Sequence, residues 1–392
     1  AYGNTGEASK TYINCTDEGS DGIADGIVTV CRDTSCYCRC DGVDDHIEIN
    51  QATAYINSIG GGTVHLKSGT YIISESITIY DNTIFEGDGW STVIKLVDHA
   101  TNPPWVHYLG MLDIKQRDNV TIQNLKIDGN MYNQDFAPDD WEGQPIVFHS
   151  CTNCTVQNTY ILHGNCDSIS TYYVEGTGKW NEDMKILNNT LEQCSHNQLQ
   201  LSTVKDLEIR NNTFIGAGNS AMTLHYCYNC TIANNVLMGT GWTGMQFMSW
   251  GHPGSKNIKI LDNVITGNPS AGIYLWAQVG TDAEDVEITG NIIHNCFHPT
   301  DYVPGWGIHV ETYKNVTISN NVLYNNSYGV HAPGSEVVVV KNNIVVNNIK
   351  SGFNGSNIVS TYNDVWDNGV DYSGCSPGTG DISVDPLFAD VS

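Results

Sequence analysis

Two short apolar patterns recur along the chain. The first has the form apolar-x-apolar, then x-Asn, then another apolar pair, as in MKILNNTL, CTIANNVL and VTISNNVL. Its period of two predicts β-strands and excludes helical repeats. The Asn of each phrase is Asn124, Asn158, Asn189, Asn212, Asn235, Asn263, Asn291, Asn321 and Asn343, at intervals of 22 to 34 residues. Repeats of this length built from short strands predict a solenoid.

The recurring Asn predicts a ladder inside the solenoid. A sharp turn between two strands requires a left-handed backbone, which Asn tolerates. Stacked Asn side chains can also hydrogen-bond to one another from coil to coil. We therefore expect the nine Asn positions to combine both roles.

A second strand precedes the first in each coil, with phrases such as QPIVFHS, AGIYLWA and WGIHVET. Its period of two predicts two columns of buried side chains. One column is Ile146, Ile169, Leu199, Met222, Met245, Ile273, Ile308 and Val330. The other is Phe148, Thr171, Leu201, Leu224, Phe247, Leu275, Val310 and Ala332.

Both ends of this array carry family features. Residues 41–71 look like an opening segment, a capping helix followed by first strands, and YNDVWDNGVDYSGCSPGTGDISVDPLF looks like a closing segment. The phrase TIQNLKIDGN, ending at Asn130, is similar to bacterial mannuronan C5-epimerases. Residues 41–392 resemble right-handed parallel β-helix proteins of the pectate-lyase-like superfamily. The resemblance implies an all-β solenoid with an internal Asn ladder, preceded by a Cys-rich cap over residues 1–40.

The resemblance also suggests where catalytic residues would lie. Epimerases and lyases of this fold remove a proton beside a uronate carboxyl group, which requires a cation, a base and an acid. When the coils are aligned, Asp167 matches the family's Tyr-x-x-Asp phrase, whereas Asn219 and Ser220 stand where an Arg-His pair belongs. Asp167 would also be the first of the three aspartates that polygalacturonases use. The catalytic candidates for an enzyme are Asp167, His225, His309 and Glu311.

The outward positions of the second strand predict a carbohydrate-binding surface. Aromatic rings stack on sugars, and imidazole and carboxylate groups bond hydroxyls. The candidate binding residues are Tyr172, Gln246, Tyr274, Trp276 and His331. Of these, Tyr274 and Trp276 should form one patch with His309 and Glu311 across two coils, with His331 beside it. The alternative is that loops or another copy of the chain cover these rings. His309 and Glu311 are too few ligands to predict a metal site.

Charge narrows the choice of partners. The chain has 43 Asp+Glu against 17 Lys+Arg, a formal charge of −26. This excludes a nucleic-acid partner, which would require clustered Lys and Arg. No apolar run is long enough to span a bilayer. The charge also disfavours polyuronates unless Ca²⁺ bridges the two acids, so Ca²⁺ is the one cofactor left open.

The 13 cysteines favour an oxidising compartment. Together with the absence of an initial Met, they predict an extracellular or cell-surface protein from which a signal peptide has been removed. The CRDTSCYCRC cluster should staple the N-terminal cap, and Cys166 and Cys194 should form a bridge. Each Cys-x-x-Cys could hold a local disulfide or two thiols, and their separation excludes one shared zinc ion. The disulfide candidates are Cys31, Cys36, Cys38, Cys40, Cys151, Cys154, Cys166, Cys194, Cys227 and Cys230.

The chain also contains N-x-[ST] acceptor motifs for N-glycosylation. Several fall inside the Asn repeat, which would produce such motifs by itself. The candidate sites are Asn14, Asn119, Asn153, Asn188, Asn211, Asn229, Asn315, Asn325 and Asn354.

Two hypotheses about function follow. The first is a structural or assembly protein of the sheath, filament or surface-layer type, or one that interacts with carbohydrate. Its partners would be a polysaccharide or glycan, or copies of itself. The second is a secreted polysaccharide-active enzyme, such as a uronate lyase, a C5-epimerase or a glycoside hydrolase.

Overall fold

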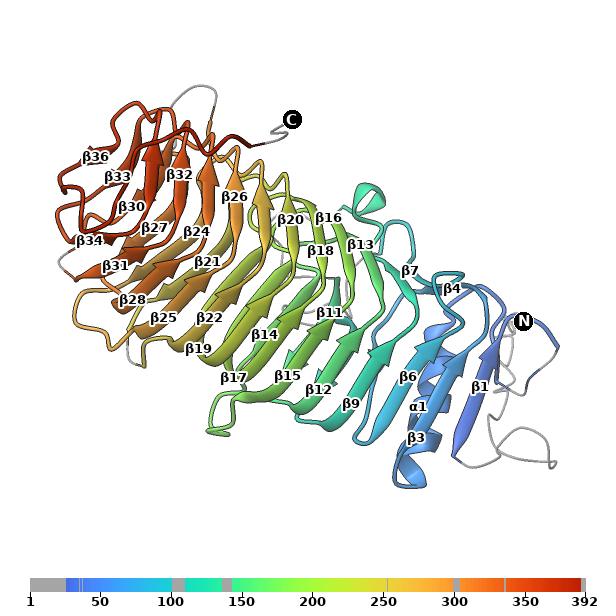
Figure 1. Cartoon of the computed structure of the whole chain (residues 1–392). Helices are drawn as coiled ribbons and strands as arrows, with labels where there is room; N and C mark the ends of the chain where they lie inside the picture. The colour runs from blue at the N-terminus through green and yellow to red at the C-terminus, as the bar shows by residue number, and fades with distance from the viewer. Residues whose placement is uncertain are drawn as a thin grey trace, which may run out of the picture.

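The computed structural model describes residues 26–34, 36, 38–100, 110–135, 143–251, 253–298, 304–334 and 336–388. The chain winds into a right-handed parallel β-helix whose coils follow one another in sequence order from the blue end to the red end of Figure 1. All strand pairs with a defined direction are parallel, and each strand pairs with its counterpart in the next coil.

The coils have three faces. The first face holds β5 (Ile77–Thr78), β8 (Gly110–Lys115), β11 (Gln144–His149), β14 (Ile169–Tyr172), β17 (Leu199–Arg210), β19 (Met222–Ala233), β21 (Thr243–Ser249), β24 (Ala271–Ala277), β27 (Trp306–Glu311), β30 (Tyr328–His331), β33 (Ser351–Asn354) and β36 (Tyr372–Ser373). The long strands β17 and β19 continue into the second face, so the first two faces form one 24-stranded sheet.

The second face holds β1 (Ile27–Cys31), β2 (Cys38–Arg39), β3 (Gly62–Leu66), β6 (Thr83–Gly87), β9 (Asp118–Gln123), β12 (Thr152–Gln157), β15 (Asn181–Leu187), β22 (Lys256–Leu261), β25 (Glu284–Thr289), β28 (Lys314–Ser319), β31 (Val338–Lys341) and β34 (Ile358–Thr361). Because β1 pairs with β3, this face begins inside the segment that the sequence assigns to the cap.

The third face is a 12-stranded sheet. It holds β4 (Gly69–Ile73), β7 (Thr92–Leu96), β10 (Lys126–Asp128), β13 (Tyr160–Gly164), β16 (Thr190–Cys194), β18 (Thr213–Ala217), β20 (Val236–Met238), β23 (Val264–Thr266), β26 (Ile292–His294), β29 (Val322–Tyr324), β32 (Ile344–Val346) and β35 (Asp364–Trp366).

Two helical segments accompany the strands. The capping helix expected from the sequence is α1 (His46–Ser58), which buries Ile49, Ala52 and Ile56 against the first coils. A single 3₁₀ turn, η1 (Met131–Asn133), follows β10. No helix in the described part of the chain has the length and hydropathy to cross a membrane.

The predicted inward columns of the first face are confirmed. Ile146, Ile169 and Leu199 pair in register, and both columns are buried throughout. Alternation places these side chains inside because each strand has the core on one side only. The same register therefore fixes which side chains of β11 to β30 point outward.

The Asn ladder is present, with a correction to its membership. The stacked residues are Asn189, Asn212, Asn235, Asn263, Asn291, Asn321, Asn343 and Asn363. Thr159 closes the ladder at one end through its N–H and hydroxyl donors to the Asn189 Oδ1, and Asp381 accepts from Asn363 at the other. Asn124 and Asn158 were wrongly included. They lie one position earlier, with φ of 54° and 53°; Asn124 is half-buried and Asn158 is exposed.

The disulfide prediction is confirmed for Cys31, Cys36 and Cys38 in the cap, and it is wrong for Cys40 and for the Cys166–Cys194 bridge. Cys31 and Cys36 form a disulfide, and Cys38 is also disulfide-bonded. Cys40 is a buried thiol whose pKa burial raises. Cys166 and Cys194 do not form the expected bridge.

The reason is the register of the strands. Cys194 pairs with Gly164, two residues before Cys166, so the two cysteines are not stacked on one another. All four residues of the Cys-x-x-Cys motifs are buried thiols. A hydrogen bond with Cys154 lowers the pKa of Cys151, and the same bond, together with burial, raises the pKa of Cys154.

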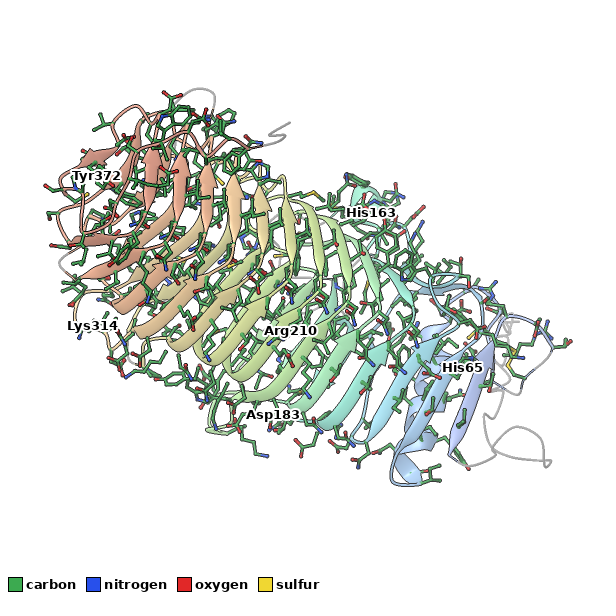
Figure 2. The ribbon with its side chains drawn as sticks, in the orientation of Figure 1. His65, His163, Asp183, Arg210, Lys314 and Tyr372 are labelled. Atoms are coloured by element: carbon green, nitrogen blue, oxygen red, sulfur yellow. A yellow bond between two sulfur atoms is a disulfide. The ribbon has the colours of Figure 1, made fainter. Side chains whose placement is uncertain are left out.

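The acceptor Asn residues lie at turns. Except for Asn14, which is outside the described residues, and Asn354, which is half-buried, each is exposed and has a left-handed backbone. Figure 2 shows Asp183, a left-handed residue of the same outer row, at the lower edge of the solenoid, far from His163 at the upper edge. Glycosylation at these positions stays a prediction.

Candidate functional site

The outward side of the first face carries the most concentrated set of polar and aromatic side chains that the sequence singled out. Strand register stacks Gln246 on Tyr274, Tyr274 on His309, and His309 on His331. A parallel row stacks Met248 on Trp276 and Trp276 on Glu311. The pleat of β24, β27 and β30 therefore brings the expected patch together.

The patch is larger than the sequence suggested. Three further rings border it, and we call the whole set the aromatic surface: Trp250, Tyr274, Trp276, Trp306, His309, Tyr328 and His331. The ring of Tyr274 lies 4.8 Å from that of His309 at an interplanar angle of 9°. Trp306 stacks on His309 at 4.1 Å and on His331 at 5.2 Å. Trp250 and Trp276 lie 4.5 Å apart.

Sequence analysis missed the three added rings for a local reason. Trp306 and Tyr328 pair with each other at the start of their strands, just before Gly307 and Gly329. Simple alternation from the buried Ile308 would have placed Trp306 inside, but its ring lies against those of His309 and His331 on the outward side. Trp250 directly follows β21 and is 54% exposed. The sequence did contain a signal for two of these rings: Trp306 and Tyr328 each stand immediately before the glycine at the same position of their strands.

His309 is the buried centre of this surface. Its side chain is only 3% exposed because Tyr274, Trp306 and His331 cover it. Burial, with a smaller contribution from His331, lowers the pKa of His309 to about 3. Burial also lowers the pKa of His331. Both imidazoles are consequently neutral near pH 7.

Hydrogen bonds orient the polar atoms. The two Nδ1 atoms of His309 and His331 lie 2.9 Å apart, so one of them carries the proton and donates to the other. The Nε2 of His309 lies 3.3 Å from the Glu311 Oε2. Burial, and then the nearby Glu311 carboxylate, raise the pKa of Tyr274, which keeps its hydroxyl protonated. The surface thus presents ring faces with neutral donors and acceptors, and one half-exposed carboxylate.

Three other candidates do not belong to this surface. Gln246 is buried and donates from Nε2 to the Thr223 Oγ1 at 2.7 Å. His225 lies two coils before Trp276, and burial lowers its pKa. Tyr172 lies four coils away, or about 19 Å at ~4.8 Å per coil.

Tyr172 belongs instead to a second cluster on the same face. The His149 Nε2 lies 3.4 Å from the Asp113 Oδ1, at the far limit of hydrogen bonding, and its ring lies 5.6 Å from that of Tyr172. The Tyr172 hydroxyl bonds Gln144. Burial, and then the Asp167 charge, raise the pKa of Tyr172. Sequence analysis missed Asp113 because its strand, β8, was not among the aligned phrases.

Asp167 is buried just before β14, where its Oδ1 lies 2.9 Å from the Nδ1 of His196. Strand register places Asp167 about five coils from Glu311, so these two acids do not form a catalytic pair.

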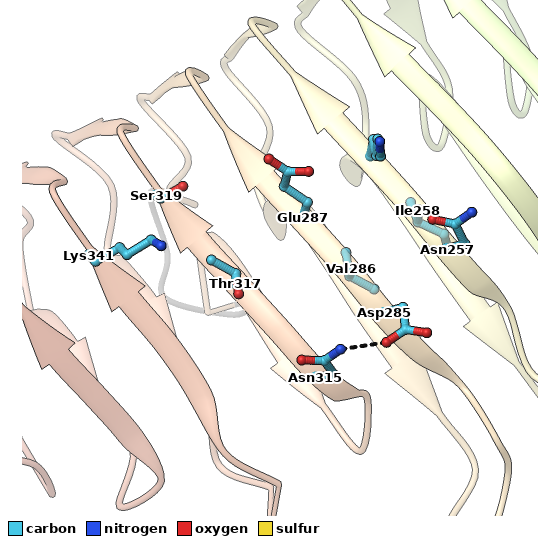
Figure 3. A pocket seen from close by; sticks show the side chains of 10 residues that line it. Asn257, Ile258, Asp285, Val286, Glu287, Asn315, Thr317, Ser319 and Lys341 are labelled. Atoms are coloured by element: carbon cyan, nitrogen blue, oxygen red, sulfur yellow. Dashed lines mark hydrogen bonds between the residues drawn. The ribbon is translucent and has the colours of Figure 1, made fainter.

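The second face carries a shallow groove of different character. It crosses β22, β25, β28 and β31, and in Figure 3 the Asn315 amide bonds the Asp285 carboxylate beside it. Its charged residues are Lys259, Asp285, Glu287 and Lys341. Mixed charges without aromatic rings make it a weaker candidate for a sugar site than the first face.

Comparison with known proteins supports the fold. Residues 110–285 match the family model described as a right-handed beta helix region, and residues 278–378 match one described as periplasmic copper-binding protein (NosD). The mannuronan C5-epimerase AlgE6 of Azotobacter vinelandii is 33% identical over 122 aligned positions. That match covers 27% of this chain and 14% of the epimerase.

Solved structures cover much more of the chain. The A-module of the A. vinelandii mannuronan C-5 epimerase AlgE4 has a TM-score of 0.67 at 16% identity, covering 88% of this chain and 97% of the module. PfbA, a surface adhesin of Streptococcus pneumoniae, has a TM-score of 0.65 at 15% identity, covering 86% of this chain and 89% of the adhesin. The chain is a right-handed parallel β-helix protein with the fold of the pectate-lyase-like superfamily.

Proposed function

We propose that the protein binds a polysaccharide through the aromatic surface of its first face. The observation that carries this proposal is the layer of stacked rings on β24, β27 and β30, whose edges remain open to solvent. The exposed ring of Trp250 can stack on the apolar face of a sugar, while His331 and Glu311 at the ring edges are placed to bond hydroxyls. Polar groups at the ring edges suit a surface that binds hydroxyl groups better than a packed apolar core, where they would have no hydrogen-bond partners.

The charges favour a neutral sugar. His309 and His331 are neutral and offer no cation to a uronate carboxylate, and the nearby Lys350 lies at the border of the surface, with its Nζ 5.5 Å from the centre of the Tyr328 ring. Glu311 and the overall charge of −26 would repel an acidic polymer. Neutral hexose units need no cation and are not repelled by the negative charge.

The setting of this function is outside the cytosol. The Cys31–Cys36 disulfide supports an oxidising compartment, and the structural relatives include a surface adhesin and a periplasmic epimerase. We propose a secreted or cell-surface protein that attaches to glycan. Assembly with copies of itself is the alternative use of the same rings.

A titration distinguishes these uses. Neutral and acidic oligosaccharides, with and without Ca²⁺, are titrated into the chain while tryptophan fluorescence and sedimentation are followed. Trp276→Ala should weaken neutral-sugar binding by about two- to tenfold, since a lost ring contact costs about 0.5–1.5 kcal/mol. The matched control is Trp90→Ala, an exposed tryptophan stacked on Tyr160 away from the first face. Self-association without sugar binding would contradict the proposal.

A second candidate function is polysaccharide modification at Asp113, His149 and Tyr172. A protonated tyrosine beside a histidine and a carboxylate can supply an acid and a base to one sugar carbon. His149→Gln and Tyr172→Phe should each abolish any release of unsaturated or shortened sugar. Trp276→Ala should retain it on short substrates. Activity that survives both substitutions would remove this candidate.

A further inference from the structure

The turns that lead into β14 and β17 bring three different metal-binding side chains together. Cys166 and Asp167 lie in one turn and His196 in the equivalent turn of the next coil. The His196 N–H donates to the Cys166 carbonyl oxygen at 2.9 Å, and the Cys166 N–H donates to the Ser195 hydroxyl at 2.7 Å. These bonds hold the two turns together without using the side chains of Cys166, Asp167 and His196.

The three side chains converge. One ligand atom from each, a thiol sulfur, a carboxylate oxygen and an imidazole nitrogen, lies within 4.8 Å of the other two. The Asp167 Oδ1 and the His196 Nδ1 are 2.9 Å apart. Two ligands about 2.0–2.2 Å from one zinc ion would lie ~3.0–3.5 Å from each other, so a small outward movement would admit the ion.

Asp167 carries a buried charge that the protein only partly satisfies. The residue is 0% exposed. Its Oδ1 accepts from the Asn197 backbone N–H at 3.0 Å and contacts His196, whereas its Oδ2 is buried and has no hydrogen-bond partner. A buried carboxylate with an unsatisfied oxygen costs several kcal/mol unless a cation compensates it.

The surroundings resemble the outer shell of a metal site. The Asn197 side-chain nitrogen lies 2.9 Å from the His196 Nδ1, and the Asn219 side-chain nitrogen lies 3.3 Å from its Nε2. Outer partners of this kind orient metal-binding imidazoles. The side chain of His196 is 25% exposed, which leaves an approach for an ion from solvent.

We propose that Cys166, Asp167 and His196 bind one zinc ion, with water in the fourth position. A thiolate, an imidazole and a carboxylate are the ligand types that zinc takes, and three protein ligands leave one place open. On binding, the Cys166 thiol loses its proton to solvent, and the neutral His196 imidazole binds through its nitrogen that carries no proton. The site lies beside Tyr172, but the inference does not rest on the proposed sugar binding.

The test is zinc binding by the metal-free chain. The chain should take up one tightly bound equivalent of Zn²⁺, measured by calorimetry and by elemental analysis after gel filtration. Co²⁺ in its place should give a thiolate-to-metal charge-transfer band. His196→Gln should weaken zinc binding by at least about 100-fold, since loss even of an outer partner costs 10–100-fold.

Controls separate this site from the other thiols. His196→Gln leaves every cysteine in place, including the buried Cys-x-x-Cys pairs. Cys166→Ser should remove the cobalt band, whereas Cys375→Ser, at a half-buried thiol elsewhere, should not. His294→Gln, which alters an imidazole stacked on Tyr324, should leave zinc binding unchanged. Failure to bind zinc, or binding that survives His196→Gln and Cys166→Ser, would overturn the inference.

Discussion

At the scale of single residues, two consecutive residues play different roles in each turn between the second and third faces. The first, such as Asn234, is exposed and adopts the left-handed backbone at φ 55°. The second, such as Asn235, is buried and bonds the coils on both sides. The sequence suggested one residue for both roles. The phrases align equally well at either position, and burial alone separates them.

Replacing the buried member should be costly. In Asn235→Ala the Asn212 N–H and the Ile209 carbonyl lose their partners, and each unsatisfied buried group costs about 1–3 kcal/mol. We expect the free energy of unfolding to fall by about 3 kcal/mol in urea denaturation. Asn234→Gly, which keeps the left-handed turn accessible, should change it by less than about 0.5 kcal/mol. Equal losses in the two variants would contradict the division of roles.

His309 should make stability depend on pH. Above pH 6.5 it is neutral in both states; below that value the unfolded chain takes up a proton that the folded chain, with a pKa of about 3, refuses. Stability should therefore fall as the pH drops from 6.5 towards 3.

The size of this effect can be isolated by substitution. Between neutral pH and about pH 5, wild type should lose about 2 kcal/mol more than His309→Gln, since one pKa unit corresponds to ~1.4 kcal/mol. Denaturation curves at the two pH values measure this difference. Parallel losses in both proteins would show that His309 is not buried in its neutral form.

At the scale of elements, the first-face strands approach each other most closely at a column of glycines. A Cβ on Gly307 would lie 2.7 Å from the Gly329 carbonyl oxygen, and one on Gly329 would lie 2.5 Å from that of Gly352. Trp306 and Tyr328 pair just outside this column, and the rings of both contact His331. The glycines therefore support the aromatic surface as well as the coil spacing.

A methyl group added at one of these glycines should disturb both the spacing of the coils and the aromatic surface. Gly307→Ala should lower stability by about 1–3 kcal/mol, the usual cost of overpacking, and weaken sugar binding. Gly251→Ala is the control, because a Cβ there would have no neighbour within 4 Å. Thermal unfolding and the fluorescence titration test the two effects. A neutral Gly307→Ala would show that the coils can separate at this point.

The elements also show how far sequence reasoning reaches. The inward columns and the stacking of Tyr274 on His309 follow from period two, because alternation and coil alignment suffice to place them. Trp306 and Asp113 could not be placed this way. The Trp306 ring lies on the outward side although alternation from Ile308 would place it inside, and Asp113 lies on a strand that the repeat phrase does not include. The absent Cys166–Cys194 bridge depended on a two-residue offset in register that the phrases do not reveal.

At the scale of the whole molecule, the formal charge is −26, whereas the aromatic surface carries two neutral imidazoles and is bordered by the charged side chains of Glu311 and Lys350. Affinity for a neutral oligosaccharide should then change less than about twofold when salt is raised to shorten the Debye length from ~10 Å to ~3 Å. Repeating the titration at the two salt concentrations measures this. A large loss of affinity at high salt would indicate charge pairing and a different ligand class.

The central claim is that glycan lies on the aromatic surface, and tryptophan footprinting tests it most directly. The chain is oxidised with and without a saturating neutral oligosaccharide, and each tryptophan is quantified by mass spectrometry. Bound sugar should protect Trp250, Trp276 and Trp306 while leaving the exposed Trp90 equally reactive. Protection of Trp90 alone, or equal oxidation of all four in the bound chain, would contradict the account.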